Sequence, residues 1–169
     1  AVEKIKTLMH NPALKEELQE LYGECRLVNN LQEKYEEGDF KSCYEILDSS
    51  ISLDNIELSK LLEKHWAKLM NECEEHALKG DIKSIKKVLG ELISVKTRLG
   101  KIGDLFRVSF HIKMKVLLSK KSYKSAENII YSYIDIFGKD SELLSIMKIY
   151  ERASGKKLAI TIDQEKRVH

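Results

Sequence analysis

The feature that most constrains the fold is a short segment that occurs three times at nearly equal spacing. It reads Gly-Asp-Phe-Lys-Ser-Cys at 38–43, Gly-Asp-Ile-Lys-Ser-Ile at 80–85 and Lys-Ser-Tyr-Lys-Ser-Ala at 121–126, so the spacings are 42 and 41 residues. In each copy the first residue can end one helix, and the following Asp or Ser can accept hydrogen bonds from the free N–H groups of the next helix. We expect a helix, a tight turn and a second helix in every copy. Because one helical pair cannot cover its own apolar faces, neighbouring pairs are expected to stack.

Long helices are expected between these turns, because the chain contains only one proline and eight glycines. Asn11-Pro12 is typical of a helix start, and Asp54-x-x-Glu57 and Asp140 are two further expected N-caps. Each start is followed by apolar residues at three- and four-residue steps, as on the buried face of a helix. These stripes are Leu14, Leu18, Leu21, Cys25, Val28 and Leu31; then Leu58, Leu61, Leu62, His65, Trp66, Leu69 and Cys73; and then Leu143, Leu144, Met147 and Tyr150.

Residues 108–116 show a conflicting pattern, because apolar and polar residues alternate there with period two, which is typical of a strand. As a helix the same segment would have a broad apolar stripe, which suits an inner helix packed on two sides. The repeat places it as the first helix of the third pair, so we predict a helix. Residues 160–162 are expected to be extended.

The fold class predicted from these patterns is all-α, a right-handed α-α solenoid of stacked helix-turn-helix units. The predicted organisation is one domain over 1–154, with units at about 14–50, 55–98 and 104–137, a capping helix at 141–154, and a flexible C-terminal tail at 155–169. The chain begins with Ala1, not methionine, and is poor in proline. We expect it to be one segment of a larger bacterial protein.

The turn segments resemble the tetratricopeptide repeat family, in which a glycine, a polar residue and an aromatic mark the turn and a small residue follows three places later. Gly-Asp-Phe-x-x-Cys at 38–43 is the nearest match; 80–85 keeps the glycine, and Tyr123-x-x-Ala126 keeps the aromatic and the small residue. The resemblance covers roughly residues 20–137. The period of about 42 is longer than the family's 34 and closer to that of HEAT-type and armadillo-type helical repeats.

This resemblance implies that the first helix of each unit lines a concave groove that binds a protein or peptide partner. Exposed amides and a few charges would suit the backbone of an extended peptide. Counting back from each turn gives the residues expected in the groove: Asn29, Gln32, Tyr35, Asn71, Glu74, His111 and Lys115. The same residue types also occur on an ordinary helical surface.

Charged residues are unevenly distributed along the chain. Residues 1–78 contain 9 basic and 17 acidic side chains, residues 79–124 contain 13 and 3, and residues 125–169 contain 7 of each. The middle segment could attract nucleic acid, an anionic lipid surface or another acidic partner, or the two regions could complement each other within one molecule or between copies. The expected patch for an anionic partner consists of Lys83, Lys86, Lys87, Arg98, Lys101, Lys113, Lys120, Lys121 and Lys124.

Motifs for catalysis and cofactor binding are missing from the sequence. There is no H-E-x-x-H, no G-x-S-x-G and no glycine-rich phosphate loop. S-x-x-K occurs three times without its companion motifs, as chance would give in a chain rich in Lys and Ser. Cys73 and His76 lie one turn apart, but zinc needs three or four ligands. We therefore expect no enzyme activity, no metal and no cofactor.

The function predicted from the sequence is that of a non-catalytic scaffold or adaptor for protein–protein interaction. Two alternatives stay open: binding of nucleic acid or another anionic partner through residues 79–124, and a structural domain that self-associates into a homo-oligomer. No run of about 18 apolar residues occurs, so no membrane span is expected. Three cysteines without a C-x-x-C motif favour the cytoplasm or another reducing compartment.

Overall fold

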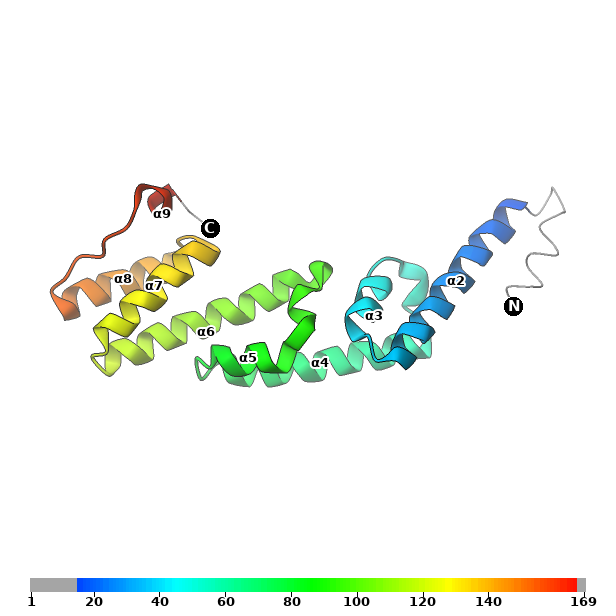
Figure 1. Ribbon diagram of the computed structural model, residues 1–169, viewed down its shortest axis with the longest axis horizontal. Coiled ribbons are helices and arrows are strands. Elements are labelled where there is room, and N and C mark those ends of the chain that lie inside the picture. Colours follow the sequence, from blue (N-terminus) through cyan, green and yellow to red (C-terminus); the bar gives the residue numbers. More distant parts are fainter. Residues whose placement is uncertain (1–14, 167–169) are drawn as a thin grey trace. The chain divides into compact units, whose positions relative to one another are not determined.

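The computed structural model describes residues 15–166, and these residues form helices joined by short turns, with no β-strand among them (Figure 1). The predicted all-α class is confirmed. The helix start predicted at Asn11-Pro12 lies outside the described residues. The α-helices are α2 (Lys15–Glu37), α3 (Phe40–Leu47), α4 (Glu57–Ala77), α5 (Ile82–Leu89), α6 (Leu99–Ser119), α7 (Tyr123–Phe137), α8 (Ser141–Ser154) and α9 (Ile162–Lys166). Three 3₁₀ turns are η2 (Ile51–Leu53), η3 (Gly90–Ser94) and η4 (Lys96–Arg98).

The described residues form two compact units. Among the described residues, unit 1 consists of 15–68 and 91–99, and unit 2 consists of 69–90 and 100–166. Helix α4 therefore contributes residues to both units, and the segment that precedes α6 belongs to unit 1.

The three repeated turns have the same backbone conformation. Gly38, Gly80 and Lys121 all have positive φ angles, of 75°, 68° and 57°. In each turn the amide of the next residue donates to the carbonyl five residues earlier, at 3.0 Å in the first turn and 2.9 Å in the other two. This is the hydrogen bond of the Schellman motif, which closes a helix with one left-handed residue. Each of these turns is therefore a corner between two helices, as the sequence predicts.

The residue after each left-handed position is the N-cap of the next helix. The carboxylates of Asp39 and Asp81 accept a hydrogen bond from the backbone N–H of Ser42 and Ser84, at 3.1 Å in both cases. Hydrogen bonds from these serines also lower the pKa of each carboxyl below its usual range. Ser122 occupies the equivalent place but makes no side-chain capping hydrogen bond. The third corner therefore has the same shape with weaker local support.

Residues 108–116 are helical, as predicted, and lie within α6. Ser109, Phe110 and Met114 are buried there, which is the spacing of one helix face and not that of a strand. The apolar faces of α6, α7 and α8 meet in the core of unit 2. This core contains Phe110, Met114, Leu118, Ala126, Ile130, Tyr133, Ile134, Leu143, Ile146 and Tyr150.

The segment predicted to be a flexible tail lies along α7 as far as it is described. Leu158 and Ile160 pack against the core of unit 2, and the amide of Ala159 donates to the hydroxyl of Tyr131 at 2.9 Å. The side chain of Lys139 forms an ion pair with Glu165 at 2.8 Å. Residues 160 and 161 have no regular structure, whereas Ile162 begins α9.

The second corner predicts a measurable effect of Gly80→Ala. A Cβ atom at this position would lie 2.9 Å from the backbone nitrogen of Lys113, and the φ angle of 68° disfavours any side chain. The left-handed conformation alone costs about 1–2 kcal/mol for a residue with a side chain. We expect Gly80→Ala to lower the free energy of unfolding by at least that amount, measured by urea denaturation of the full chain followed by circular dichroism.

Two variants control for this effect. Gly103 lies in α6, and no neighbouring side chain comes within 4 Å of the place that a Cβ would occupy, so Gly103→Ala should stabilise the chain by up to about 1 kcal/mol through helix propensity. Lys121→Gly removes the side chain from a left-handed position and should also be stabilising. Equal effects of Gly80→Ala and Gly103→Ala would contradict this account of the corner.

Candidate partner-binding surface

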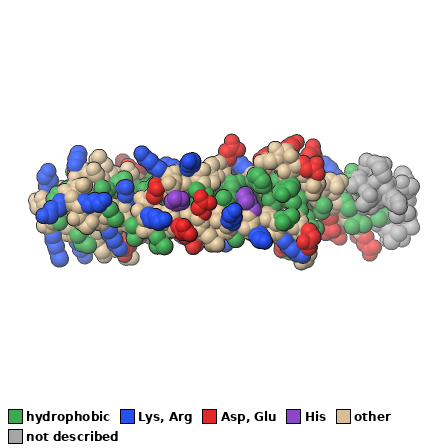
Figure 2. Space-filling view, turned by 90° about the horizontal axis from the view of Figure 1, so that it is seen from below, with side chains coloured by type: hydrophobic (Ala, Val, Ile, Leu, Met, Phe, Trp, Pro, Cys, Tyr) green, Lys and Arg blue, Asp and Glu red, His purple; other side chains and the backbone are tan. Residues whose placement is uncertain are grey.

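Four side chains form an apolar surface on unit 1, which we call the aromatic face: Tyr35, Phe40, Leu61 and His65. Tyr35 lies in the last turn of α2, Phe40 is the first residue of α3, and Leu61 and His65 lie one turn apart on α4. Tyr35 is 37% exposed and Leu61 is 56% exposed, whereas Phe40 and His65 are half-buried. Figure 2 shows hydrophobic side chains gathered over this part of unit 1.

The first corner brings these rings together. It reverses the chain between Tyr35 and Phe40, whose ring centroids lie 6.0 Å apart in an edge-to-face arrangement. Phe40 in turn contacts His65 across the α3–α4 interface, with 5.0 Å between the ring centroids. The aromatic face is therefore continuous from α2 through α3 to α4.

A hydrogen-bond network below the aromatic face holds the His65 ring in place. The hydroxyl of Tyr44 donates to the carbonyl of Leu62 at 3.0 Å and lies 2.9 Å from Nδ1 of His65. Because this hydroxyl has one hydrogen, which the carbonyl takes, Nδ1 of His65 must donate. In the neutral imidazole, Nε2 of His65 is then the acceptor.

The guanidinium of Arg98 lies among carboxylates and aromatic rings of the same unit. Its guanidinium forms a forked contact with Asp48, with Nη2–Oδ1 at 2.6 Å and Nε–Oδ2 at 2.9 Å, and it also bonds to Glu63. The same group lies over the rings of Tyr44 and Trp66, at 4.6 and 4.7 Å from their centroids. Only 11% of the Arg98 side chain is exposed. Arg98 therefore joins the segment before α6 to α3 and α4.

This contact changes the ionisation of both partners. Burial favours the neutral form of Asp48, but the hydrogen bonds from Arg98 and Thr97 outweigh it and hold the pKa of this carboxyl below its usual range. Burial also opposes the charge on Arg98, and the two carboxylates outweigh that effect and raise its pKa. Arg98 was predicted to belong to the patch for an anionic partner, but its charge is engaged by acidic residues of its own unit.

The residues predicted for a peptide groove fall in both units. In unit 1, Asn29 and Gln32 are exposed on α2, about two turns and one turn before Tyr35, and Nε2 of Gln32 donates to Glu36 at 2.8 Å. In unit 2, Asn71 and Glu74 are exposed on α4. On α2, Gln32 is the helical neighbour of Tyr35, and Asn29 is the neighbour of Gln32, so the three residues form a line that winds around the helix toward the aromatic face.

The other two predicted groove residues of unit 2 take part in contacts between α6 and α8. Lys115 forms an ion pair with Glu142 at 2.5 Å. Nε2 of His111 lies 3.4 Å from Oδ2 of Asp140, without hydrogen-bond geometry, and burial lowers the pKa of His111. Asp140 also accepts a hydrogen bond from the hydroxyl of Tyr133 and caps α8 through the amide of Leu143 at 2.7 Å. These contacts hold helices together.

Most of the predicted basic patch lies on unit 2. The residues that are exposed there are Lys83, Lys86, Lys87, Lys101, Lys120, Lys121 and Lys124, and Lys113 is half-buried beside Gly80. Figure 2 shows many Lys and Arg side chains over the part of unit 2 that contains α7, α8 and the end of α6. The nearby aromatic rings belong to the core: Phe110 is buried, and Phe106 and Tyr123 pack against it. These rings contribute to packing inside unit 2, and none of the three is fully exposed as a stacking platform for bases.

Sequence reasoning missed the aromatic face because it assigned Leu61 and His65 to a buried stripe. Leu62, Trp66 and Cys73 of that stripe are buried, whereas Leu61 is not. The signal in the sequence was the width of the stripe, because Leu61 beside Leu62 and His65 beside Trp66 are more than one packed face requires.

No protein-family model, curated protein or solved structure matches this chain, so neither its fold nor its function comes from a relative. Within residues 15–166, no three His, Cys, Asp or Glu side chains are grouped so that they could hold a metal ion. None of the described helices combines the length and hydropathy needed to cross a bilayer.

The Arg98 site predicts a loss of stability on Arg98→Ala. This substitution leaves a partly buried carboxylate without its cation and uncovers two aromatic rings. We expect a decrease of about 2 kcal/mol in the free energy of unfolding at pH 7, measured by urea denaturation. Arg98→Lys should recover only part of it, because an ammonium cannot reproduce the fork.

The difference in free energy of unfolding between wild type and Arg98→Ala should depend on pH. The pKa of Asp48 is lower in the folded chain than in the unfolded one, so its contribution is present at neutral pH and disappears as the pH falls below about 4. The difference between wild type and Arg98→Ala should therefore shrink in acid. Lys96→Ala, at an exposed position two residues away, is the control and should change stability by no more than about 0.5 kcal/mol. If Arg98→Ala lowered the free energy of unfolding by no more than this control, the role given to Arg98 would be contradicted.

Proposed function

We propose that this chain is a non-catalytic scaffold or adaptor whose aromatic face binds a peptide segment of a protein partner. The observation that carries the proposal is the exposure of Leu61 and Tyr35 beside two half-buried rings. Continuous apolar surface of this kind, rimmed by polar residues, is typical of protein interaction sites, where aromatic side chains contribute much of the binding energy. The rim here includes the Lys34–Glu37 ion pair and Lys64.

An extended peptide is the occupant that fits this surface best. Asn29 and Gln32 offer amide groups along α2 on the side that leads to Tyr35, and an extended backbone needs both donors and acceptors. An apolar side chain of the peptide would pack on Leu61 and Tyr35. The neutral ring of His65 offers an acceptor at Nε2, so a donor next to that apolar side chain would strengthen binding.

The wider arrangement that we propose is a right-handed solenoid of tetratricopeptide-like helical pairs within a larger bacterial protein. It is supported by the common geometry of the three corners. A non-catalytic role is supported by the two polar clusters around Arg98 and Asp140, whose members bond to one another and hold helices in place. The three free cysteines fit a reducing compartment.

The test is a selection of random peptides displayed on phage against the full chain. The dissociation constants of the selected peptides are then measured by fluorescence anisotropy for wild type and for Leu61→Asp. We expect Leu61→Asp to weaken binding by at least about tenfold, because a carboxylate would have to be desolvated against the peptide's apolar side chain.

Ile149→Asp is the matched control. Ile149 lies on α8 of unit 2 and is 50% exposed, so the same substitution is made at a similarly exposed apolar residue outside the aromatic face. Peptides whose affinity is insensitive to Leu61→Asp, or that respond equally to both variants, would contradict the proposed site.

The alternative of an anionic partner keeps one specific observation in its favour. Lys83, Lys86 and Lys87 are exposed on α5, opposite the buried Ile85 and Leu89. A nucleic acid bound there would dissociate steeply with added salt, because counterions return to the phosphates. Its binding would also be unchanged by Leu61→Asp, which separates this alternative from the proposed one.

A further inference from the structure

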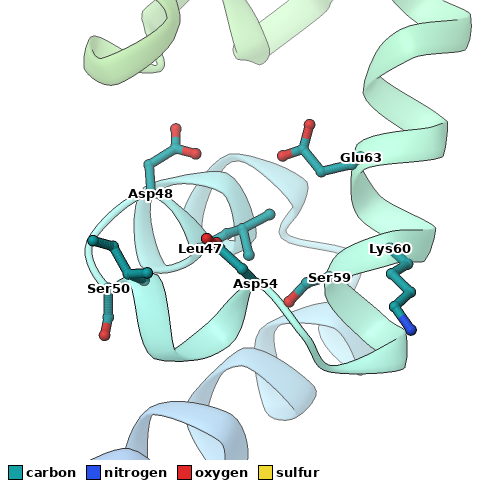
Figure 3. A pocket seen from close by; sticks show the side chains of 8 residues that line it. Leu47, Asp48, Ser50, Asp54, Ser59, Lys60 and Glu63 are labelled. Atoms are coloured by element: carbon teal, nitrogen blue, oxygen red, sulfur yellow. The ribbon is translucent and has the colours of Figure 1, made fainter.

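Unit 1 contains an open pocket that the aromatic face does not use. It lies between the end of α3, η2 and the first turns of α4, and has a volume of about 330 Å³ (Figure 3). This is at the lower end of the range for ligand sites, about 300–1,000 Å³. Its lining residues are Leu47, Asp48, Ser50, Ile51, Asp54, Ser59, Lys60 and Glu63. We propose that this pocket binds a lysine or arginine side chain from a basic segment of the protein partner.

A buried hydroxyl of the pocket lacks a hydrogen-bond partner and can accept a hydrogen bond from a ligand. Ser59 is 2% exposed, and its Oγ makes no hydrogen bond with any described residue. Figure 3 shows this hydroxyl directed into the space between α4 and the loop that carries Asp54. A buried polar atom that is left unsatisfied costs about 1–3 kcal/mol. An ammonium or guanidinium group carries N–H donors and no acceptor, so it matches the free lone pairs of Ser59 and the adjacent carboxylate.

The charge around the pocket is negative in excess. Asp48, Asp54 and Glu63 contribute three carboxylates, and Arg98 neutralises one charge by bridging Asp48 and Glu63. Asp54 forms no ion pair with a described residue. The ammonium of Lys60 pairs with Glu57 at 2.7 Å and points away from the pocket in Figure 3. The excess is larger than the roughly half positive charge that the start of α4 contributes as a helix dipole.

The remaining walls suit the aliphatic part of a basic side chain. Leu47 is buried beneath the pocket, and Ile51 at its edge is 86% exposed. Lysine and arginine bury their methylene stems on apolar surface while the charged group meets polar atoms. The Arg98 site next to this pocket shows the same combination of carboxylates and apolar or aromatic neighbours around a cation.

This inference deepens the proposed function and rests on it, since the basic segment belongs to the same partner, but it involves none of the four residues of the aromatic face. The two can therefore fail separately. A titration with single amino-acid derivatives tests the pocket without a known partner, whereas the peptide selection tests the aromatic face.

The experiment is an NMR titration of the full ¹⁵N-labelled chain with Nα-acetyl-arginine amide and Nα-acetyl-lysine amide. The neutral isostere Nα-acetyl-citrulline amide is the matched probe. We expect saturable shifts, at millimolar concentrations, of the amide signals of Ile51, Asp54 and Ser59 with the cationic probes and not with citrulline. Asp54→Asn should weaken binding by about tenfold, the loss of one hydrogen bond to a charged group.

Three further variants make the result specific. Ser59→Ala should weaken binding several-fold while leaving the spectrum of the rest of unit 1 unchanged, since its hydroxyl bonds to no described residue. Glu45→Gln removes an exposed carboxylate of α3 outside the pocket and should leave the affinity unchanged, as should Leu61→Asp on the aromatic face. The proposal is overturned if the citrulline derivative shifts the same signals equally, or if Asp54→Asn and Glu45→Gln behave alike. It is also overturned if the pocket signals move with protein concentration alone, which would place a second copy of this chain in the pocket.

Discussion

The whole arrangement depends on one local constraint, a single left-handed residue followed by a capped helix start. At Gly38, Gly80 and Lys121 the chain leaves a helix with the same pair of backbone hydrogen bonds and enters the next helix two residues later. Because the turn is so short, it determines which residues of the two helices contact each other. It brings Tyr35 against Phe40 at the first corner and the backbone at Gly80 against Lys113 at the second. Packing in each unit then follows from the corner.

Helix α3 connects the structural and functional features of unit 1. It has only eight residues, and its buried side chains Cys43, Tyr44 and Leu47 hold it against its neighbours. Its first residue, Phe40, takes part in the aromatic face, and Asp48 at its end binds Arg98 and lines the acidic pocket. The proposed partner would therefore contact surfaces at both ends of one short helix, an apolar one and an acidic one.

Much of the fold was predictable because the decisive signals are local. A left-handed residue and an N-cap lie within six residues of sequence. The repeat also predicted correctly that residues 108–116 are helical, although their apolar residues alternate with period two, and this segment lies in α6. The surfaces were not predictable in the same way. Arg98 reads as part of a basic patch because lysines surround it in the sequence, but its partners Asp48 and Glu63 are 50 and 35 residues away. Likewise, the pattern of α4 does not say that Leu61 lacks a neighbour to bury it.

The most direct test of the central claim is the backbone conformation of Lys121 in solution. A lysine has no intrinsic reason to be left-handed, so its conformation reports the repeated corner and not the residue type. Three-bond HN–Hα couplings and intraresidue HN–Hα NOEs, measured by NMR on the full chain, report the sign of φ. The account predicts a positive φ at Lys121, as at Gly38 and Gly80. A negative φ at Lys121, with helix continuing from α6 into α7, would show that the three corners are not one recurring structure.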